Sequence, residues 1–425
     1  MAIPPPQLNG IVISEPNFRL RFFFAPGYLA ARLHEIRSVR DFTSRFFNIF
    51  IYIAKHALLK PAKAVVWALL VKPSWVIMDA VSDATLSTTI DKFQPRRIPR
   101  PVKNPPSKDT VGIHKCVRLS WNIQIACNHD CPYCWFHGKW QEYQGKAVIL
   151  SAKEWSTHWS RFNDRYGPAH IDIAGGEPFT YPGFIDILAM LSMRNTILAI
   201  TNFAWDPSKV IGRIDPAKVD FSCSFHPEFA PSPEVFADKV ARLREAGFYA
   251  NVSIVAYPPY LKRLAEWSDA FFSRGIYLTV LPFRGWWKGR YYPTAYTATG
   301  RRGLDWFMNG EFLRFYPEEV VCAAFPARIS ECKTLIRGRI AKEYQLNLKQ
   351  TKETLCNSGK LYGRLQFDGN MLRCSQGGHV GNFLSEDFRM HDDAKPCPHS
   401  NCECINEVIY LQGCQFGPNQ ASTPV

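Results

Sequence analysis

Residues 127–134 read CNHDCPYC, which places three cysteines at the spacing C-x3-C-x2-C with Tyr133 directly before the third. Cysteine thiolates are soft ligands that favour zinc and iron–sulfur clusters over hard cations. A structural zinc site normally closes with four ligands, and here the fourth would come from Cys116, His129 or His137. A [4Fe–4S] cluster usually takes four cysteines, so three cysteines leave one iron open to a reactant. The stretch therefore indicates an open iron–sulfur cluster, with a zinc site as the alternative.

Around this stretch, short apolar runs alternate with longer amphipathic segments. The runs cover 117–125, 170–175, 196–203, 219–225, 250–257 and 276–283. One amphipathic segment, 233–247, ends on a glycine suited to a helix C-cap. Repeated strand–helix units predict parallel strands with crossover helices, and hence an α/β fold with a partial (β/α)6 barrel. In such folds chemistry gathers at the carboxyl ends of the strands, and the cysteines directly follow the first run.

The cysteine stretch resembles the signature of the radical S-adenosylmethionine (radical SAM) enzymes, C-x3-C-x-aromatic-C after the first strand. The matching residues are Cys127, Cys131, Tyr133 and Cys134. The resemblance implies that the open iron of a [4Fe–4S] cluster chelates S-adenosyl-L-methionine. It also implies that one electron from an external donor cleaves this cofactor to a 5′-deoxyadenosyl radical, which abstracts a substrate hydrogen. The cofactor supplies that chemistry, while the protein orients it.

Further motifs follow in the order that the family has them. GGEP at 175–178 ends the second apolar run, TN at 201–202 ends the third, and SCSFHPE at 222–228 ends the fourth. The resemblance assigns cofactor binding to Tyr133, Gly175, Gly176, Glu177, Pro178, Asn202 and Ser224. Glycines without a Cβ allow the backbone to approach a ligand closely. For His226 we favour a hydrogen bond within its loop over contact with substrate.

A second group of cysteines lies near the C-terminus. Cys356 and Cys374 flank the segment RLQFDGNMLRC, whose Asp368–Gly369 pair predicts a β-hairpin. This pattern resembles the SPASM or twitch extension of radical enzymes, which implies an auxiliary [4Fe–4S] cluster. Its ligands would be Cys356, Cys374, Cys397, Cys402 and Cys404. The closing spacing, C-x4-C-x-C, departs from the longer SPASM pattern, so we expect one auxiliary cluster rather than two, with zinc as the alternative.

The N-terminal part of the chain is basic. Residues 1–110 carry sixteen Lys and Arg against seven Asp and Glu, whereas the whole 425-residue chain has a net charge of +14. Within residues 40–80 the apolar runs 46–54 and 64–71 are too short to span a bilayer, which requires about 20 residues. This segment is predicted either to pack on the catalytic domain or to lie on an anionic membrane surface. We expect no nucleic-acid partner, because no nucleic-acid motif accompanies the charge.

The cysteine content and a proline-rich linker predict the compartment and the domain boundaries. Thirteen cysteines, odd in number and locally clustered, favour metal binding in a reducing compartment, and no secretory signal is visible, so a cytoplasmic protein is predicted. A proline-rich linker at 93–109 marks a boundary. The predicted domains are a basic extension (1–110), a radical SAM core (111–300) and an auxiliary cluster domain (301–425).

The predicted function is a radical SAM enzyme that modifies a peptide or protein. One alternative is a lipid-linked or sugar substrate at a membrane surface, which the basic extension motivates. A second alternative, of a different class, is a non-enzymatic iron–sulfur scaffold or electron carrier, which would bind a cluster without cleaving S-adenosylmethionine.

Overall fold

The computed structural model of the chain describes residues 116–138, 140–143, 145–308, 348–349, 351–402 and 410. The chain divides into two compact units, Met1–Ala80 and Val81–Val425, and every described residue belongs to the second. The basic segment at 40–80, the linker at 93–109 and Cys404 lie outside the described residues. The boundary near 110 lies outside them too, whereas residue 300 falls within a helix, Ala298–Met308, so both boundaries stay predictions.

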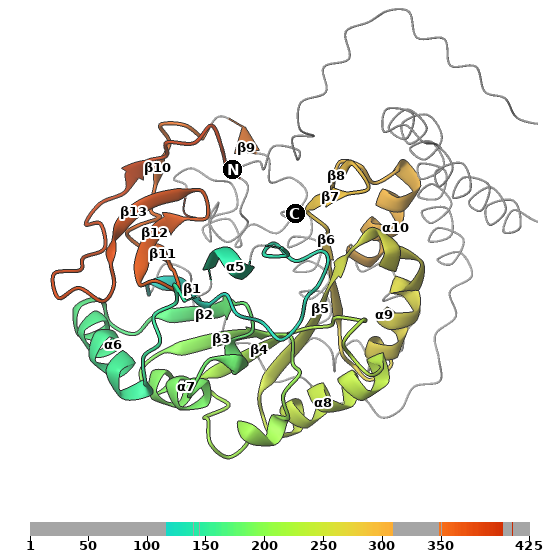
Figure 1. The fold of residues 1–425 in the computed structure, drawn as a ribbon, viewed down its shortest axis with the longest axis horizontal. Coiled ribbons are helices and arrows are strands. Elements are labelled where there is room, and N and C mark those ends of the chain that lie inside the picture. Colours follow the sequence, from blue (N-terminus) through green and yellow to red (C-terminus); the bar gives the residue numbers. More distant parts are fainter. Residues whose placement is uncertain are drawn as a thin grey trace, which may run out of the picture. The chain divides into compact units, whose positions relative to one another are not determined.

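The centre of this unit is a parallel sheet whose strands lie side by side in sequence order (Figure 1). Its strands are β1 Arg118–Gln124, β2 His170–Gly175, β3 Thr196–Thr201, β4 Val219–Ser224, β5 Tyr249–Ala256 and β6 Leu278–Pro282. Each strand pairs in parallel with the next. Five of them lie within the predicted apolar runs, and β5 begins one residue before its run. The predicted mixed α/β fold with a parallel sheet is therefore confirmed.

Helices lie along the outer side of the sheet in Figure 1. They are α6 Ala152–Tyr166, α7 Phe184–Ser192, α8 Pro233–Glu245, α9 Leu264–Phe272 and α10 Ala298–Met308. The short helix α5 Trp140–Tyr143 follows the cysteine loop and is drawn near the centre of Figure 1, apart from the outer helices. Three 3₁₀ turns, η3 Pro178–Thr180, η4 Pro207–Lys209 and η5 Pro258–Arg263, follow β2, β3 and β5. Local signals set the helix ends: Ser151 and Glu154 form a capping box at α6, and Gly247 after α8 has a φ of +88°.

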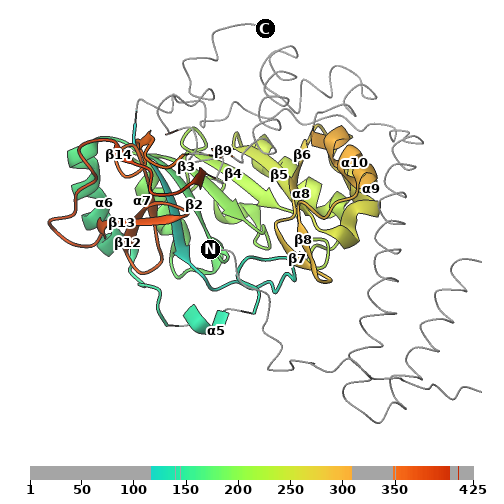
Figure 2. The same cartoon turned by 90° about the horizontal axis from the view of Figure 1, so that it is seen from above.

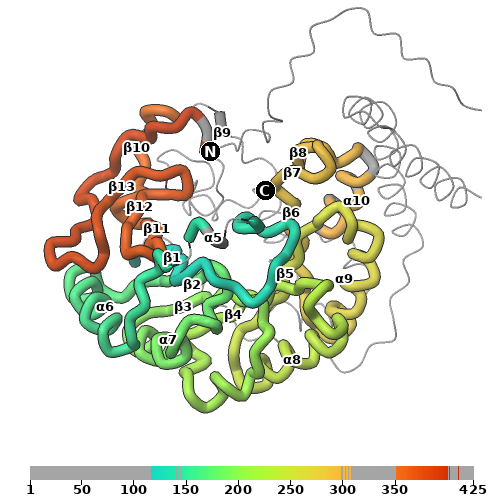
Figure 3. Tube along the Cα trace, in the orientation of Figure 1, coloured from blue at the N-terminus to red at the C-terminus, as the bar shows by residue number. Residues whose placement is uncertain are grey.

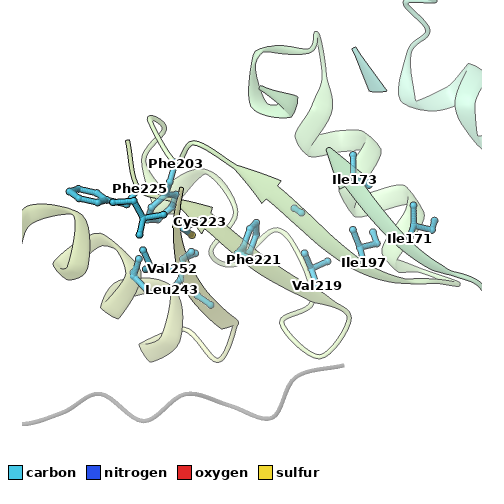
Figure 4. Packing of buried hydrophobic residues seen from close by; sticks show 14 of the residues in the cluster. Ile171, Ile173, Ile197, Phe203, Val219, Phe221, Cys223, Phe225, Leu243 and Val252 are labelled. Atoms are coloured by element: carbon cyan, nitrogen blue, oxygen red, sulfur yellow. The ribbon is translucent and has the colours of Figure 1, made fainter. Parts of the chain in front are cut away.

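Apolar side chains fill the space between sheet and helices (Figure 4). Ile171, Ile197 and Phe221, from three successive strands, are completely buried. Leu243 of α8 and Val252 of β5 are completely buried in the same cluster. Burying one such side chain stabilises the fold by about 1.5–3 kcal/mol. This packing holds the strands in register and so fixes where their carboxyl ends lie.

The C-terminal strands extend the same sheet beyond β1 (Figures 2 and 3). β11 (Tyr362–Leu365) pairs in parallel with β1, and β12 (Asn370–Cys374) and β13 (Gly377–Asn382) continue antiparallel. The predicted hairpin turn is present, with Gly369 at a φ of +83°. Six short strands form three separate pairs: β7 Gly285–Trp287 with β8 Arg290–Tyr292, β9 Leu348–Lys349 with β15 Asn401–Cys402, and β10 Leu355–Cys356 with β14 Lys395–Pro396.

Candidate functional site

The loop that carries the first three cysteines is joined to the end of β2 by backbone hydrogen bonds. The Gly176 N–H donates to the Gln124 carbonyl at 2.8 Å, and the Glu177 N–H donates to the Ala126 carbonyl at 2.9 Å. A Cβ on Gly176 would lie 2.0 Å from the Ala126 oxygen, and one on Gly175 would lie 2.1 Å from the Gln124 oxygen. The two glycines therefore allow β2 to approach the cysteine loop, in addition to any approach to a ligand.

The Glu177 carboxylate ties this loop region to β3. The side chain is buried and accepts from the Phe179 N–H at 3.0 Å, the Asn202 N–H at 2.6 Å and the Thr201 hydroxyl at 2.7 Å. Burial raises the pKa of Glu177, and the three hydrogen bonds act in the opposite direction. Pro178 is buried as the first residue of η3. The carboxylate acts here as a buried brace between β2 and β3.

Asn202 reaches from the end of β3 to the cysteine loop. Its Nδ2 donates to Asn128 Oδ1 at 2.7 Å and lies 3.9 Å from Cys127 Sγ. Ser224 ends β4, two strands beyond β2, is half-buried, and pairs in register with Ser253 of β5. The predicted site residues from β2, β3 and β4 thus stand at the carboxyl ends of neighbouring strands, and Asn202 directly contacts the loop.

His226 lies beside the second cysteine. Its Nδ1 is 3.3 Å from Cys131 Sγ and 2.7 Å from the Tyr133 hydroxyl. We predicted a hydrogen bond within the loop that carries His226. The ring instead crosses to the cysteine loop and contacts Cys131 and Tyr133 there. Burial, with a smaller effect of His129, lowers the pKa of His226 to about 4, so the ring is neutral at physiological pH.

Burial also keeps the three thiols protonated in the absence of a ligand. It raises the pKa of Cys131 to about 12 and raises the pKa of Cys127 and of Cys134. A bound metal would lower the pKa of these thiols, because a thiol loses its proton when it coordinates a metal. Beside the cysteines, His129 Nδ1 is buried without a hydrogen-bond partner among the described residues. An orphaned polar atom next to three thiols is consistent with a site that is completed by a bound group.

Four C-terminal cysteines line one cavity. Cys356, Cys374, Cys397 and Cys402 all contribute to its wall. Cys356 and Cys374 stand at the open end of the β11–β12 hairpin, whereas the Asp368–Gly369 turn closes the other end. Because β11 runs parallel to β1, the cavity lies toward the amino end of β1 and the first cysteine loop follows its carboxyl end. Figure 2 shows α5, after the loop, and β14, beside the cavity, on opposite sides.

Arg373 joins the segments that carry the cavity cysteines, and sequence reasoning missed it. Its Nε donates to the Ser358 carbonyl at 3.1 Å, and its two terminal nitrogens each donate at 3.1 Å to the carbonyls of Pro396 and Lys395. Ser358 lies two residues after Cys356, and Pro396 directly precedes Cys397. The guanidinium therefore holds three cysteine segments together. Its position beside Cys374 was the only signal in the sequence.

The distances between candidate donor atoms can be compared with those that a single zinc ion requires. Zinc–sulfur bonds of about 2.3 Å in tetrahedral geometry place the sulfurs about 3.8 Å apart. Among the described residues, the only three Cys, His or acidic donors that all lie within 4.8 Å of one another are His129, Cys131 and His226. This set contains one loop cysteine, whereas neither the three loop thiols nor any three of the cavity thiols lie within that distance of one another.

Comparison with known protein families decides the assignment. Residues 121–271 match the Radical SAM superfamily, and this range contains the three loop cysteines and the GGEP segment. Residues 121–271 form a domain of the Radical SAM superfamily. The radical SAM core is an enzyme core, and membership implies a [4Fe–4S] cluster and S-adenosylmethionine. No curated protein sequence matched the chain.

Solved structures with a similar arrangement include several that hold S-adenosylmethionine (AdoMet). The anSMEcpe structure with bound AdoMet is 15% identical, with coverage of 64% of this chain and 80% of that chain and a TM-score of 0.44. SuiB of Streptococcus suis bound to S-adenosylmethionine is 14% identical, with coverage of 72% and 68% and a TM-score of 0.41. BtrN in complex with AdoMet and 2-DOIA is 12% identical, with coverage of 64% and 80% and a TM-score of 0.34.

The residues of the radical SAM core fit the implied cluster. The three thiols follow β1 and do not all lie within 4.8 Å of one another, and the buried His129 Nδ1 beside them has no hydrogen-bond partner among the described residues. Cys127, Cys131 and Cys134 would hold the cluster. The specific ligand and cofactor contacts of individual residues remain predictions. None of the helices in the described part of the chain has the length and apolarity that a bilayer-spanning segment requires.

Proposed function

We propose that this radical SAM enzyme reductively cleaves S-adenosylmethionine and abstracts a hydrogen atom from a peptide or protein. One observation carries the proposal: the three-thiol loop stands at the carboxyl ends of the parallel strands, braced by Glu177 and Asn202. When bound, the [4Fe–4S] cluster and S-adenosylmethionine supply a 5′-deoxyadenosyl radical, with one electron from an external donor. The protein positions these groups and excludes water.

The residues around the loop divide this work. Gly175, Gly176 and Pro178 shape the β2 end against the loop, and Glu177 fixes that end to β3. Asn202 orients the loop through Asn128. Tyr133 and Ser224 would border S-adenosylmethionine from the loop and from β4. We regard the sheet that presents them as a partial (β/α)6 barrel.

The cavity at the other end of β1 would hold an auxiliary [4Fe–4S] cluster. Four cysteines line it, which matches the usual ligand number, and Cys404 offers a further thiol in sequence. A fully ligated cluster has no open iron for S-adenosylmethionine. Its position toward the amino end of β1 supports electron relay or stabilisation of the C-terminal strands rather than radical formation.

A peptide or protein is the preferred substrate. Relatives that carry a SPASM-like extension mostly modify peptides and proteins, and the cysteine cavity supports such an extension here. Large aromatic side chains are also exposed near the loop and after β6: Trp135, Trp286 and Tyr291. Trp286 and Tyr291 pair across the β7–β8 hairpin, and no acidic residue occurs in 270–304. Exposed aromatics of this kind mark interaction surfaces.

The direct test is anaerobic reconstitution of the full chain with iron, sulfide, reductant and S-adenosylmethionine. We expect 5′-deoxyadenosine, and we expect none from the same protein without reductant. A folded protein that binds iron yet forms no 5′-deoxyadenosine would contradict the proposed reaction and favour the electron-carrier alternative. Deuterium transfer from a labelled peptide library into 5′-deoxyadenosine would identify a peptide substrate.

The second candidate is a lipid-linked substrate at a membrane surface, with a cytoplasmic enzyme attached peripherally. The basic, apolar segment at 40–80 favours it. Co-sedimentation with anionic vesicles at low and high salt compares the full chain with a variant that begins near residue 110. Equal sedimentation of the two proteins would contradict membrane binding by this segment and favour its packing on the catalytic domain.

A further inference from the structure

Two histidines and one loop cysteine bring their donor atoms together at the carboxyl ends of the strands. His129 and Cys131 belong to the loop after β1, and His226 follows the last residue of β4 by two positions. One ligand atom of each residue lies within 4.8 Å of those of the other two, and His226 Nδ1 is 3.3 Å from Cys131 Sγ. Cys131 is buried and both histidines are half-buried. The three donors thus come from two loops that are far apart in the sequence.

The spacing of these donors suits a tetrahedral zinc ion. Zinc bonds of about 2.3 Å to sulfur and about 2.0–2.1 Å to nitrogen place a sulfur and a nitrogen about 3.6 Å apart, and two nitrogens about 3.4 Å apart. The distance of 3.3 Å between Cys131 Sγ and His226 Nδ1 is close to the first value. Since all three donors lie within 4.8 Å of one another, movements of about 1 Å would bring them to bonding positions. Thiolate and imidazole are both ligands that zinc prefers.

Neighbouring rings hold the two histidines beside each other. Phe229 stacks on His129, with ring centroids 4.2 Å apart and planes at 11°, and the two histidine rings meet edge to face at 5.4 Å and 85°. His129 Nδ1 is buried without a hydrogen-bond partner among the described residues, and such an atom gains a partner when a group binds beside it. The Tyr133 hydroxyl, 2.7 Å from His226 Nδ1, has to turn away when that nitrogen binds an ion.

We propose that His129, Cys131 and His226 form a zinc site that competes with the loop cluster. Three protein ligands leave the fourth position of the ion to water, and the Cys131 proton passes to solvent as the sulfur binds the ion. The zinc site goes beyond the proposed function, because it needs neither S-adenosylmethionine nor a substrate. The competition rests on the proposed function, since the proposed cluster also uses the Cys131 sulfur. Zinc bound here blocks cluster assembly on the loop.

Zinc binding to the iron-free, reduced full chain tests the site. Bound zinc is measured at a series of free zinc concentrations, which a competing chelator sets. His129→Ala, Cys131→Ala and His226→Ala each remove one of the three ligands, and each should weaken binding at this site about a hundredfold. The cavity cysteines are the same in every variant, so any zinc that they bind cancels in the comparison with wild type. Circular dichroism checks that each variant is folded.

Cys127→Ala and His137→Ala are the matched controls. Cys127 is a loop thiol outside the donor set, and His137 is an exposed histidine that follows the loop and pairs with Asp130. Both variants should bind zinc as the wild type does. This result distinguishes the proposed site from a zinc site made of the three loop cysteines, because Cys127→Ala would weaken that site as strongly as Cys131→Ala.

Assembly of the loop cluster provides a second readout. The signal is the part of the iron–sulfur electron paramagnetic resonance that Cys134→Ala removes. Zinc is added before iron and sulfide, at about ten times its dissociation constant, so that about a tenth of the loops remain free. Assembly on the loop should then slow about tenfold in the wild type. In His129→Ala, which keeps all three loop thiols, the same zinc concentration should cause little delay.

The outcomes separate this inference from the proposed function. Wild-type zinc affinity in a folded His129→Ala or His226→Ala protein overturns the zinc site, and so does an equal loss of affinity in Cys127→Ala. Assembly that zinc does not slow overturns the competition. A wild-type chain that binds zinc through these three residues, yet assembles no loop cluster and forms no 5′-deoxyadenosine, overturns the proposed function and supports the zinc site.

Discussion

The two cysteine groups of this chain differ in how the backbone assembles them. The loop cysteines, 127–134, lie within eight residues and follow a single strand. The cavity cysteines come from separate segments between 356 and 402, held together by short strand pairs and by Arg373. They lie toward opposite ends of β1, whose six residue steps span roughly 20 Å. Three local thiols would leave one position of a bound cluster open, whereas four assembled thiols would enclose a cluster.

Replacing loop cysteines gives the largest expected effect. Cys127→Ala, Cys131→Ala or Cys134→Ala should reduce 5′-deoxyadenosine formation to background, because each thiol would be one of only three protein ligands of the proposed cluster. The triple variant should still bind about four irons in the cavity. Cys374→Ala should show the reverse, with iron lost and cofactor cleavage retained. Iron content and 5′-deoxyadenosine are measured together after anaerobic reconstitution.

Cys116→Ala is the control for the cysteine variants, since this half-buried thiol belongs to neither group. Sites this far apart should respond independently. A folded triple variant that binds no iron would contradict the auxiliary cluster. About eight irons in this variant would indicate two auxiliary clusters. Zinc in place of iron would support a structural zinc site.

Gly176→Ala should damage the loop through the backbone. The new Cβ would lie 2.0 Å from the Ala126 oxygen and 2.2 Å from the Ile125 oxygen, so β2 and the loop must separate. We expect a loss of about 3 kcal/mol or more of stability. Thermal unfolding measures it against Gly212→Ala, where φ is +76° but the space is open and the cost should be about 1–2 kcal/mol. Equal melting temperatures would show that the close approach does not constrain the loop.

Glu177→Gln should act more gently on the same site. The amide keeps one acceptor oxygen but turns an NH₂ group toward hydrogen-bond donors, at a cost of about 1–3 kcal/mol. Transmitted to the loop, this would slow cofactor cleavage about tenfold or more, while iron in the cavity stays unchanged. Rates of 5′-deoxyadenosine formation are compared with those of Glu245→Gln, a change at an exposed residue that ends α8. An unaffected rate would show that the hydrogen bonds of Glu177 between β2 and β3 do not influence cofactor cleavage.

Arg373→Lys should give the smallest effect, and one confined to the cavity. A lysine ammonium cannot span three carbonyls as the planar guanidinium does. We expect auxiliary iron to be removed by a chelator about tenfold faster, since about two hydrogen bonds are lost. Cofactor cleavage should stay at the wild-type rate. Arg194→Lys, in an exposed ion pair with Asp164, is the control, and equal chelation rates would contradict the role of Arg373.

The sequence alone determined the parallel strands, the loop cysteines and the hairpin turn. Each of these depends on neighbours within a few residues: apolar alternation, ligand spacing, or the need of Gly369 for a positive φ. The sequence also predicted which C-terminal cysteines gather, because the turn at Asp368–Gly369 brings the two ends of a hairpin together. Cys404 lies outside the described residues, so its part in the group remains a prediction.

Only the tertiary structure decided how these pieces contact one another. Glu177 accepts from Thr201 of β3, and His226 crosses from the end of β4 to the cysteine loop. No spacing in the sequence encodes these contacts, because they depend on the parallel register that places several strand ends along one edge. β11 likewise joins β1 across more than two hundred residues. Short sequence spacings determine which potential ligands lie together, whereas tertiary packing determines which side chains contact them.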